Sequence, residues 1–344
     1  MNVLFLVTDA YGGHGGIALF NRELCGALDH RITVIPRVIR GAVRDVPPNV
    51  TFIAEAAKGP ISYMRAVAAA RRAKPDLVIC GHINLLPVAF GNPLLVVHGI
   101  EAWKRRRAPL EKCRGIVSVS ALTRDRLAGW SGYAGPTYVL PNAVHFEDYG
   151  IREKRLDLVE RYKLDGKRVL LTVGRLDSAE RSKGFDEVME VLRELPEDVV
   201  YLIAGGGNDG TRLQARAREL GVGARVVFTG LFPDEEKRDL YNLADAYVMP
   251  SRGEGFGFVF LEAMACGVPV IGSKLDGGRE ALLDGKLGLL VDPTNPAEIR
   301  AAIVETLARG ERRVPEGLDY FSFGKFVERS RAILSSAGMD RTRS

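Results

Sequence analysis

Short apolar runs alternate with amphipathic stretches along the first 140 residues, a pattern typical of parallel α/β sheets. The apolar run at 3–8 is followed by a glycine-rich turn at 12–16 and by a helical pattern that continues to about Leu28. Further helices are expected at 61–73 and 121–129. The other strands are expected at 31–38, 50–53, 77–80, 94–97, 115–119 and 137–140. The alternation predicts a doubly wound parallel sheet.

The alternation starts again near residue 150, after the Pro141-Asn142 pair that ends the first unit. Strands are expected at 169–173, 199–204, 225–228, 246–250, 268–272 and 288–291. Helices are expected at 185–194, 211–220, 235–244, 258–266 and 296–308, and a last one at 320–335. The sequence therefore predicts two Rossmann-like α/β domains. Open α/β sheets bind ligands beyond the carboxyl ends of their strands, so two domains facing each other would form a small-molecule cleft.

Composition limits the class of protein. A chain of 344 residues fits two domains of about 150 residues each, and 46% hydrophobic residues exclude a mostly disordered chain. The four cysteines lie far apart with no CxxC pair, which favours buried thiols over a disulfide framework or a zinc site. No apolar stretch reaches the ~18–20 residues of a membrane span, and no basic segment precedes the first apolar run. We expect a cytoplasmic protein and a frayed tail at 339–344.

The charge is unevenly distributed. Residues 1–150 hold 18 Lys and Arg against 11 Asp and Glu, a net charge of +7, and the remainder carries −2. A basic half suits a phosphorylated ligand, an anionic membrane or a nucleic acid. The basic residues gather on the helical pattern at 62–74 and in the run 104–107, which favours either the inner membrane surface or a solvated face. Nucleic acid is disfavoured because no aromatic–basic interleaving is present.

The densest candidate chemistry lies at Arg252–Phe258, which reads RGEGFGF and leads into a helical segment. Glu254 stands in the glycine-rich loop, and Glu262 follows eight residues later inside the expected helix. Glycines let the backbone approach a ligand closely, and a helix N-terminus offers free N–H groups to phosphate. A carboxylate beside such donors can bind sugar hydroxyls. The alternative is a tight turn with a surface glutamate.

These two glutamates, in the context GEGFG…EAMACGVPVI, resemble the signature of retaining glycosyltransferases with the GT-B fold, and most closely glycosyltransferase family 4, the group I glycosyltransferase domain. The resemblance extends over most of the second half. Its other segments there are Gly174-Arg-Leu176, Lys183-Gly184, 203–207, 228–230 and Gly277-Gly278. The first half matches more weakly, through its glycine-rich first loop, 98–101, 119–120 and 141–143.

The resemblance implies a domain plan and a donor site. Residues 1–148 would bind the acceptor together with a C-terminal helix at about 320–336 that crosses back to the first domain, and 149–319 would bind the nucleotide sugar. Arg175 and Lys183 would clamp the donor diphosphate, because cations stabilise the negative charge that develops on a leaving phosphate. Glu254 would hold the transferred sugar, and Glu262 the ribose. Further donor-binding residues would be Gly15, Gly16, Gly205, Phe232, Gly255, Phe256 and Gly257.

The remaining candidates have two interpretations each. His98 follows a strand, and the resemblance implies that it contacts the transferred sugar; the alternative is a structural histidine. Glu101 could orient His98, bind acceptor or begin a helix, and Asn142 could bind ligand or form a turn. Lys237 could lie near the base. Glu280 could close the pocket or cap a helix, and it follows Arg279 where the family often has proline.

The function implied by the resemblance is retaining transfer of a hexose from a nucleotide sugar to a glycan or polyprenyl-diphosphate-linked acceptor, in cell-surface polysaccharide or glycolipid synthesis, without metal or cofactor. GDP-mannose is preferred over UDP-glucose or UDP-N-acetylglucosamine as donor. The rivals are a nucleotide-sugar epimerase, a phosphorylase and a non-catalytic nucleotide-sugar-binding protein. An NAD enzyme is disfavoured because 34–40 offers Arg37 and Arg40 but no acidic residue.

Overall fold

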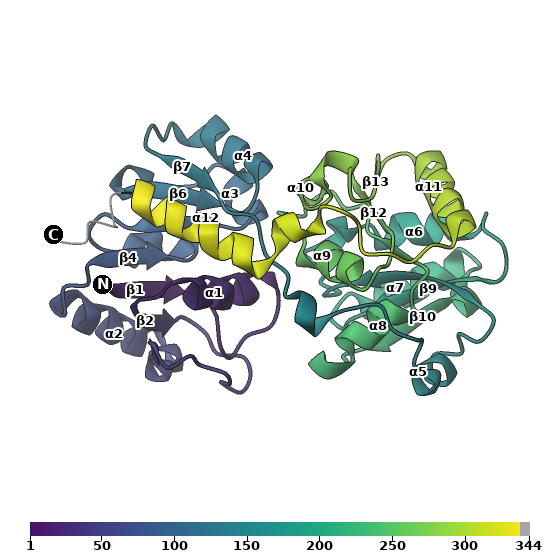
Figure 1. Ribbon diagram of the computed structural model, residues 1–344, viewed down its shortest axis with the longest axis horizontal. Helices are drawn as coiled ribbons and strands as arrows, with labels where there is room; N and C mark the ends of the chain where they lie inside the picture. The colour runs from purple at the N-terminus through teal and green to yellow at the C-terminus, as the bar shows by residue number, and fades with distance from the viewer. Residues whose placement is uncertain (338–344) are drawn as a thin grey trace. The chain divides into compact units, whose positions relative to one another are not determined.

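The structure is a computed structural model that describes residues 1–337 as two compact units, each built on a parallel sheet. The first unit comprises Met1–Ala143 and the C-terminal helix that begins at Phe323, and the second comprises Val144–Ser322 (Figure 1). The predicted α/β fold with two parallel-sheet domains is confirmed. The expectation for 339–344 lies outside the described residues.

The first unit contains a seven-stranded sheet in the order β3-β2-β1-β4-β5-β6-β7, and all its pairs are parallel. Its interior strands are buried along their whole length because helices cover both faces, which is why they read as unbroken apolar runs. The strands are β1 (Asn2–Val7), β2 (Arg31–Pro36), β3 (Val50–Phe52), β4 (Leu77–Cys80), β5 (Leu94–Val97), β6 (Gly115–Ser118) and β7 (Thr137–Val139).

The helices of the first unit include one that comes from the end of the chain. They are α1 (Gly16–Ala27), η1 (Ala54–Lys58), α2 (Pro60–Arg72), η2 (Ile83–Val88), α3 (Ile100–Trp103), η3 (Leu110–Lys112), α4 (Ala121–Ser131) and α12 (Phe323–Ser336). The α12 helix, yellow in Figure 1, packs on α1, where Phe20 and Phe326 meet edge to face with ring centroids 5.7 Å apart. Within residues 1–337 no helix combines the length and apolarity that crossing a bilayer requires.

The second unit contains a six-stranded parallel sheet in the order β10-β9-β8-β11-β12-β13. Its strands are β8 (Arg168–Val173), β9 (Val199–Ala204), β10 (Val226–Gly230), β11 (Ala246–Val248), β12 (Val270–Ser273) and β13 (Leu289–Val291). Its α-helices are α5 (Leu156–Arg161), α6 (Phe185–Leu192), α7 (Gly210–Glu219), α8 (Lys237–Leu243), α9 (Phe258–Ala265), α10 (Gly278–Ala281) and α11 (Pro296–Arg309). Its short 3-10 turns are η4 (Phe146–Asp148), η5 (Arg181–Lys183), η6 (Gly223–Arg225), η7 (Asp234–Glu236), η8 (Leu283–Gly285) and η9 (Leu318–Phe321).

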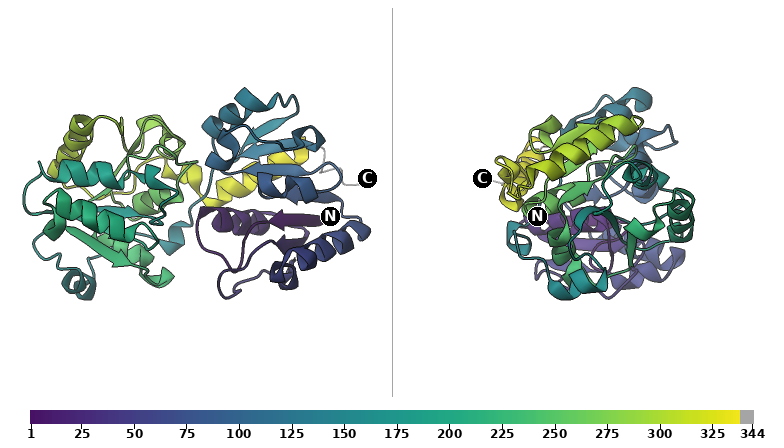
Figure 2. Two further views of the ribbon diagram at one scale, coloured as in Figure 1. Left: turned by 180° about the vertical axis from the view of Figure 1, so that it is seen from behind. Right: turned by 90° about the vertical axis from the view of Figure 1, so that its right-hand side faces the viewer.

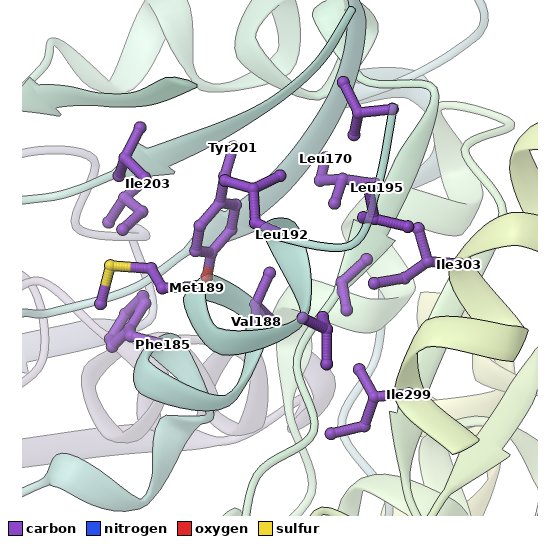
Figure 3. Close-up of a cluster of buried hydrophobic side chains, with 14 of the residues drawn as sticks. Leu170, Phe185, Val188, Met189, Leu192, Leu195, Tyr201, Ile203, Ile299 and Ile303 are labelled. Carbon is purple, nitrogen blue, oxygen red and sulfur yellow. The ribbon is translucent and has the colours of Figure 1, made fainter. Parts of the chain in front are cut away.

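Helices flank the sheets on both faces (Figure 2). In the second unit, α6 packs against both α7 and α11. Figure 3 shows this core, in which Val188 and Leu192 of α6 and Ile303 of α11 are fully buried beside Tyr201 of β9. The hydroxyl of Tyr201 is paired with Thr172 Oγ1 at 2.7 Å, so the burial of this aromatic ring leaves no lone polar atom.

The predicted helix at 320–335 is wrong in one respect. The chain forms η9, passes through Ser322 in an extended conformation (φ −62°, ψ 151°), and begins α12 at Phe323. The interruption coincides with the boundary between the two units. The other predicted elements agree with the structure to within about two residues, and the short helices α3, α5 and α10 were not predicted.

Each sheet has a point where the direction of winding reverses. In the first unit this point lies between β1 and β4, and in the second between β8 and β11. Loops that follow neighbouring strands diverge there, which leaves room for a ligand beyond the carboxyl ends. The glycine-rich segments at 12–16 and 253–257 follow β1 and β11, so each stands at the reversal point of its own sheet.

Candidate active site

Lys183 and Glu254 meet at the reversal point of the second sheet. Lys183 ends η5 in the β8–α6 connection, and Glu254 lies in the glycine-rich loop after β11. Lys183 Nζ is 3.3 Å from Glu254 Oε2, and each side chain is 20% exposed. The Glu254 carboxylate raises the pKa of the Lys183 ammonium, which keeps it charged. The pair offers a held cation and a carboxylate to a ligand that carries both phosphate and hydroxyl groups.

Arg175 follows β8 at the same edge of the sheet. Its guanidinium donates to Glu180 and has its Nε 3.8 Å from Asp177 Oδ2, and its side chain is 56% exposed. Its positive charge acts on Lys183, whose pKa it lowers slightly against the larger effect of Glu254. The structure therefore places Arg175 within electrostatic range of Lys183, which contacts Glu254. The donor-binding roles that the resemblance assigned to these residues remain predictions.

A buried carboxylate that the sequence analysis missed fixes the backbone of Glu254. Asp276 is fully buried, and its Oδ2 accepts from the N–H of Glu254 at 2.9 Å and from the hydroxyl of Ser251 at 2.7 Å. Its Oδ1 accepts from the N–H of Gly278 at 3.0 Å, and the N–H of Gly277 donates to the Glu254 carbonyl at 2.8 Å. Burial raises the pKa of Asp276 to about 6. Hydrogen bonds from Asp276 and Gly277, in one loop, therefore hold both the N–H and the carbonyl group of Glu254 in place.

Glu262 lies in α9, 2% exposed, with both carboxylate oxygens engaged. Oε1 accepts from Lys237 Nζ at 2.5 Å and Oε2 from the Tyr241 hydroxyl at 2.6 Å. Burial and then the Glu262 charge raise the pKa of Tyr241 well above its usual value, so this hydroxyl remains a neutral donor. The Tyr149 hydroxyl makes a further side-chain hydrogen bond to Glu262, so three side chains hold this carboxylate. Lys237, which the sequence analysis gave as a possible neighbour of the base, contacts Glu262.

Packing accounts for two of the predicted donor-binding positions. Gly205 follows β9 with φ 145°, and a Cβ there would lie 1.9 Å from the Gly174 carbonyl oxygen. Gly257, with φ 92°, precedes α9, and a Cβ there would meet Phe260 at 2.6 Å. A role of these glycines in donor binding stays a prediction, because close backbone approach alone requires them.

The other predicted positions of the second unit differ in exposure. Gly255 is buried, and Phe256, 2% exposed, meets Phe321 edge to face with ring centroids 5.5 Å apart. Phe232 lies partly exposed in the turn after β10, and Glu280 lies partly buried on α10. The contacts that the resemblance assigned to them remain predictions.

His98 stands at the carboxyl end of β5 in the first unit. Its Nε2 lies 2.9 Å from the Gly81 carbonyl oxygen, and its backbone N–H donates to Glu101 Oε1 at 2.5 Å. Burial lowers the pKa of His98, so the ring is neutral at pH 7. Because a carbonyl oxygen only accepts, Nε2 carries the proton and Nδ1 keeps a lone pair. Glu101, at the start of α3, holds the backbone of His98 rather than its ring.

His82 is a second histidine at this edge, and the sequence analysis missed it. It follows β4, is 7% exposed, and its ring lies nearly parallel to that of His98 with centroids 6.4 Å apart. Its Nδ1 accepts from the N–H of Asn84 at 3.1 Å. Burial lowers the pKa of His82 as well. The position of a histidine two residues after a predicted strand was the signal that could have found it.

The remaining first-unit candidates lie at the ends of β1 and β7. Gly15, with φ 94°, precedes α1, and both it and Gly16 are exposed. Asn142 is 6% exposed, and its Oδ1 is buried without a hydrogen-bond partner among residues 1–337. Asp9, also not anticipated, is 5% exposed behind Gly13, and burial raises its pKa. In the same described range, no group of three or more His, Cys, Asp and Glu side chains could hold a metal ion.

Comparison with known proteins finds a family match within the second unit. Residues 155–314 match the family model of the glycosyl transferases group 1. The match contains Arg175, Lys183, Glu254 and Glu262, which are the residues that the structure gathers at and beside the β8–β11 reversal point.

Curated relatives share part of their length with this chain. A GDP-mannose-dependent alpha-(1-6)-phosphatidylinositol monomannoside mannosyltransferase of Mycolicibacterium smegmatis is 36% identical over 214 residues, which cover 59% of this chain and 55% of that protein. A D-inositol 3-phosphate glycosyltransferase of Corynebacterium jeikeium is 36% identical over 160 residues, which cover 44% of this chain and 38% of that protein. The chain thus spans about half, or less, of the length of these relatives.

Solved structures match the whole fold. Anabaena HepE in complex with UDP-glucose superposes with a TM-score of 0.77 at 20% identity, covering 98% of this chain and all of HepE. The lipopolysaccharide outer core galactosyltransferase WaaB gives a TM-score of 0.72 at 18% identity, with 98% and 100% covered. At these identities the likeness establishes the fold, which is GT-B.

Proposed function

We propose that this protein is a retaining, metal-independent glycosyltransferase of family 4 that transfers a hexose from a nucleoside diphosphate sugar. The observation that carries the proposal is the contact between Lys183 and Glu254. It joins a largely buried ammonium to a carboxylate, and the two residues come from two loops at the same edge of the sheet. A nucleotide sugar presents the matching groups, a diphosphate next to a ring of hydroxyls. The match of 155–314 to the group 1 glycosyl transferases supports the same assignment.

Each residue of the second unit takes a role that its surroundings permit. Lys183 and the exposed Arg175 stabilise the charge that appears on the phosphate oxygen when the bond to the sugar breaks. Glu254 accepts from the hydroxyls of the transferred sugar, and Glu262 from those of the ribose. Retention follows from attack of the acceptor on the face that the phosphate leaves, with a phosphate oxygen helping to take up the acceptor proton.

The proposed donor is GDP-mannose, supported by the mannosyltransferase relative of Mycolicibacterium smegmatis, which its name describes as GDP-mannose-dependent. UDP-glucose is the competing donor, supported by its presence in the HepE structure. We assign the donor to the second unit and a glycan or lipid-linked acceptor to the first. The basic residues of the first unit favour binding to the anionic inner face of the cell membrane. We place the reaction there, in cell-surface polysaccharide or glycolipid synthesis.

A thermal-shift screen tests donor binding. GDP, UDP and ADP, each with and without the attached sugar, are added at 100 times their dissociation constant, where a bound ligand stabilises the folded state by about 2.7 kcal/mol. We expect the GDP pair to raise the melting temperature most. A larger shift with the UDP pair would replace the donor assignment, and no shift with any of the three would contradict nucleotide-sugar transfer.

Metal removal tests the proposed charge stabilisation. Because Arg175 and Lys183 supply the cations at the phosphate, we expect the transfer rate to change less than twofold after exhaustive dialysis against EDTA. The rate is measured with and without added Mg²⁺ or Mn²⁺. A loss of activity that either ion restores would show that the protein uses a metal for this step.

A further inference from the structure

A hydrogen bond determines which ring nitrogen of His82 accepts and which one donates. Its Nδ1 accepts from the backbone N–H of Asn84 at 3.1 Å, so Nδ1 carries no proton. Burial lowers the pKa of His82, and the ring is therefore neutral at pH 7 with its single proton on Nε2. Among residues 1–337 nothing accepts a hydrogen bond from Nε2. The neighbouring His98 offers an acceptor where His82 offers a donor. Its Nε2–H donates to the Gly81 carbonyl, and the lone pair on its Nδ1 is left to accept a hydrogen bond.

Arg106 lies beside His82 through the same residue, Asn84. Its Nη1 donates to Asn84 Oδ1, while its Nε is buried without an acceptor in the described part of the chain. Within that part Arg106 forms no ion pair. Burial lowers the pKa of His82 most, the Glu101 carboxylate raises it, and the charges of His98 and Arg106 lower it further. Asn84 thus contacts both side chains: its backbone N–H donates to Nδ1 of His82, and its Oδ1 accepts from Arg106. The donors of this cluster are the Nε2–H of His82 and the guanidinium of Arg106, which carries the positive charge.

We propose that His82 and Arg106 bind a phosphate group of the acceptor substrate. A phosphate oxygen carries negative charge and only accepts hydrogen bonds, which matches two donors of which one is cationic. The acceptor hydroxyl, in contrast, must donate, and the free Nδ1 of His98 is the matching acceptor in the same unit. That the phosphate belongs to the acceptor rests on the proposed function. The anion site itself rests on the contacts of Asn84 with His82 and Arg106 and on the neutral state of the His82 ring.

The competing explanation is structural, because His82 also caps η2 through its bond to Asn84. The His82→Asn variant separates the two. Asparagine is a favoured N-cap, and its side-chain oxygen can take the place of Nδ1, so the turn is kept while the Nε2 donor is lost. Arg106→Gln removes the positive charge. Arg105→Gln is the matched control, because Arg105 is exposed on the same loop and its replacement by glutamine removes the same charge.

The experiment titrates inorganic phosphate at pH 7.5 into the full-length protein and its three variants, with saturating nucleoside diphosphate present, and follows the amide resonance of Asn84. We expect a saturable shift in the parent protein and in Arg105→Gln, and at least a tenfold weaker dissociation constant in His82→Asn and Arg106→Gln. Equal phosphate affinity in all four proteins would overturn the proposal, as would an equal loss in Arg105→Gln. Nucleotide affinity, measured in the same variants, reports on the proposed function separately and is expected to stay constant.

Discussion

Replacing Lys183 by alanine is expected to lower kcat/KM for sugar transfer by about 10²–10³-fold, the range found when one preorganised charge-stabilising group is removed. The effect is large because Lys183 is fixed before the ligand arrives, with its Nζ 3.3 Å from Glu254 and its side chain only 20% exposed. The Glu254 carboxylate raises the pKa of Lys183 above the ordinary 10.5, so the ammonium stays charged below pH 10. The measurement is initial-rate kinetics with the donor found by thermal shift.

The matched control is Lys167→Ala, because Lys167 is exposed in the same unit next to the amino end of β8. It removes the same charge far from the loops that follow the strands, and we expect kinetics within twofold of the parent protein. Donor hydrolysis without acceptor is measured in parallel, since it isolates departure of the diphosphate from acceptor binding. Unchanged hydrolysis and transfer in Lys183→Ala would refute the role of this lysine in stabilising the leaving group.

The sheets could be predicted from sequence because buried parallel strands leave a strong signal. Segments such as Leu94–Val97 and Val199–Ala204 are apolar without interruption, since both of their faces are covered. Helices α3 and α10 have four residues each, too few for a helical period to be seen. The break at Ser322 was missed because apolar residues continue on both sides of it, at Phe321, Phe323 and Phe326. Phe321 and Phe323 are two residues apart and do not share a helix face, which was the signal against one continuous helix.

The candidate site divides in a similar way. Glu254 and Lys183 were found because their neighbours in the chain form recognisable motifs. Asp276 was missed because it accepts from a backbone N–H group, and a backbone group has no signature in the sequence. His82 had a signal, its place soon after a predicted strand, that the sequence analysis did not use. The bond from Glu254 to Asp276 spans 22 residues and depends on the adjacent placement of β11 and β12. Only the folded chain reveals such an acceptor.

Asp276 is expected to control both stability and activity through its ionisation. Its pKa is about 6 in the folded protein because burial penalises the charge, against 3.8 for an exposed aspartate. The folded state therefore binds this proton more tightly than the unfolded state. The stability that protonation contributes is fully present below pH 3.8 and is lost as the pH rises through 6, an amount of about 3 kcal/mol.

Activity should follow the opposite direction. Above pH 6 the ionised carboxylate accepts from Glu254, Ser251 and Gly278, whereas a proton on either oxygen displaces one of these donors. We expect the transfer rate of the parent protein to fall below pH 6 and Asp276→Asn to lack this limb. The variant should also be less stable at pH 7 by about 1–3 kcal/mol, because its amide N–H₂ must face a buried N–H group.

Urea unfolding and rate measurements between pH 4.5 and 8 test both expectations, with Asp165→Asn as the control because Asp165 is exposed. The control should reproduce both profiles of the parent protein. Asp276→Asn should give a flatter stability profile across pH 4.5–6.5 and a lower kcat at pH 7 through the loosened Glu254. If the acid limb of the rate persisted in this variant, the limb would belong to another group. The bond from the Glu254 N–H to the Asp276 carboxylate would then not control the rate through the charge of Asp276.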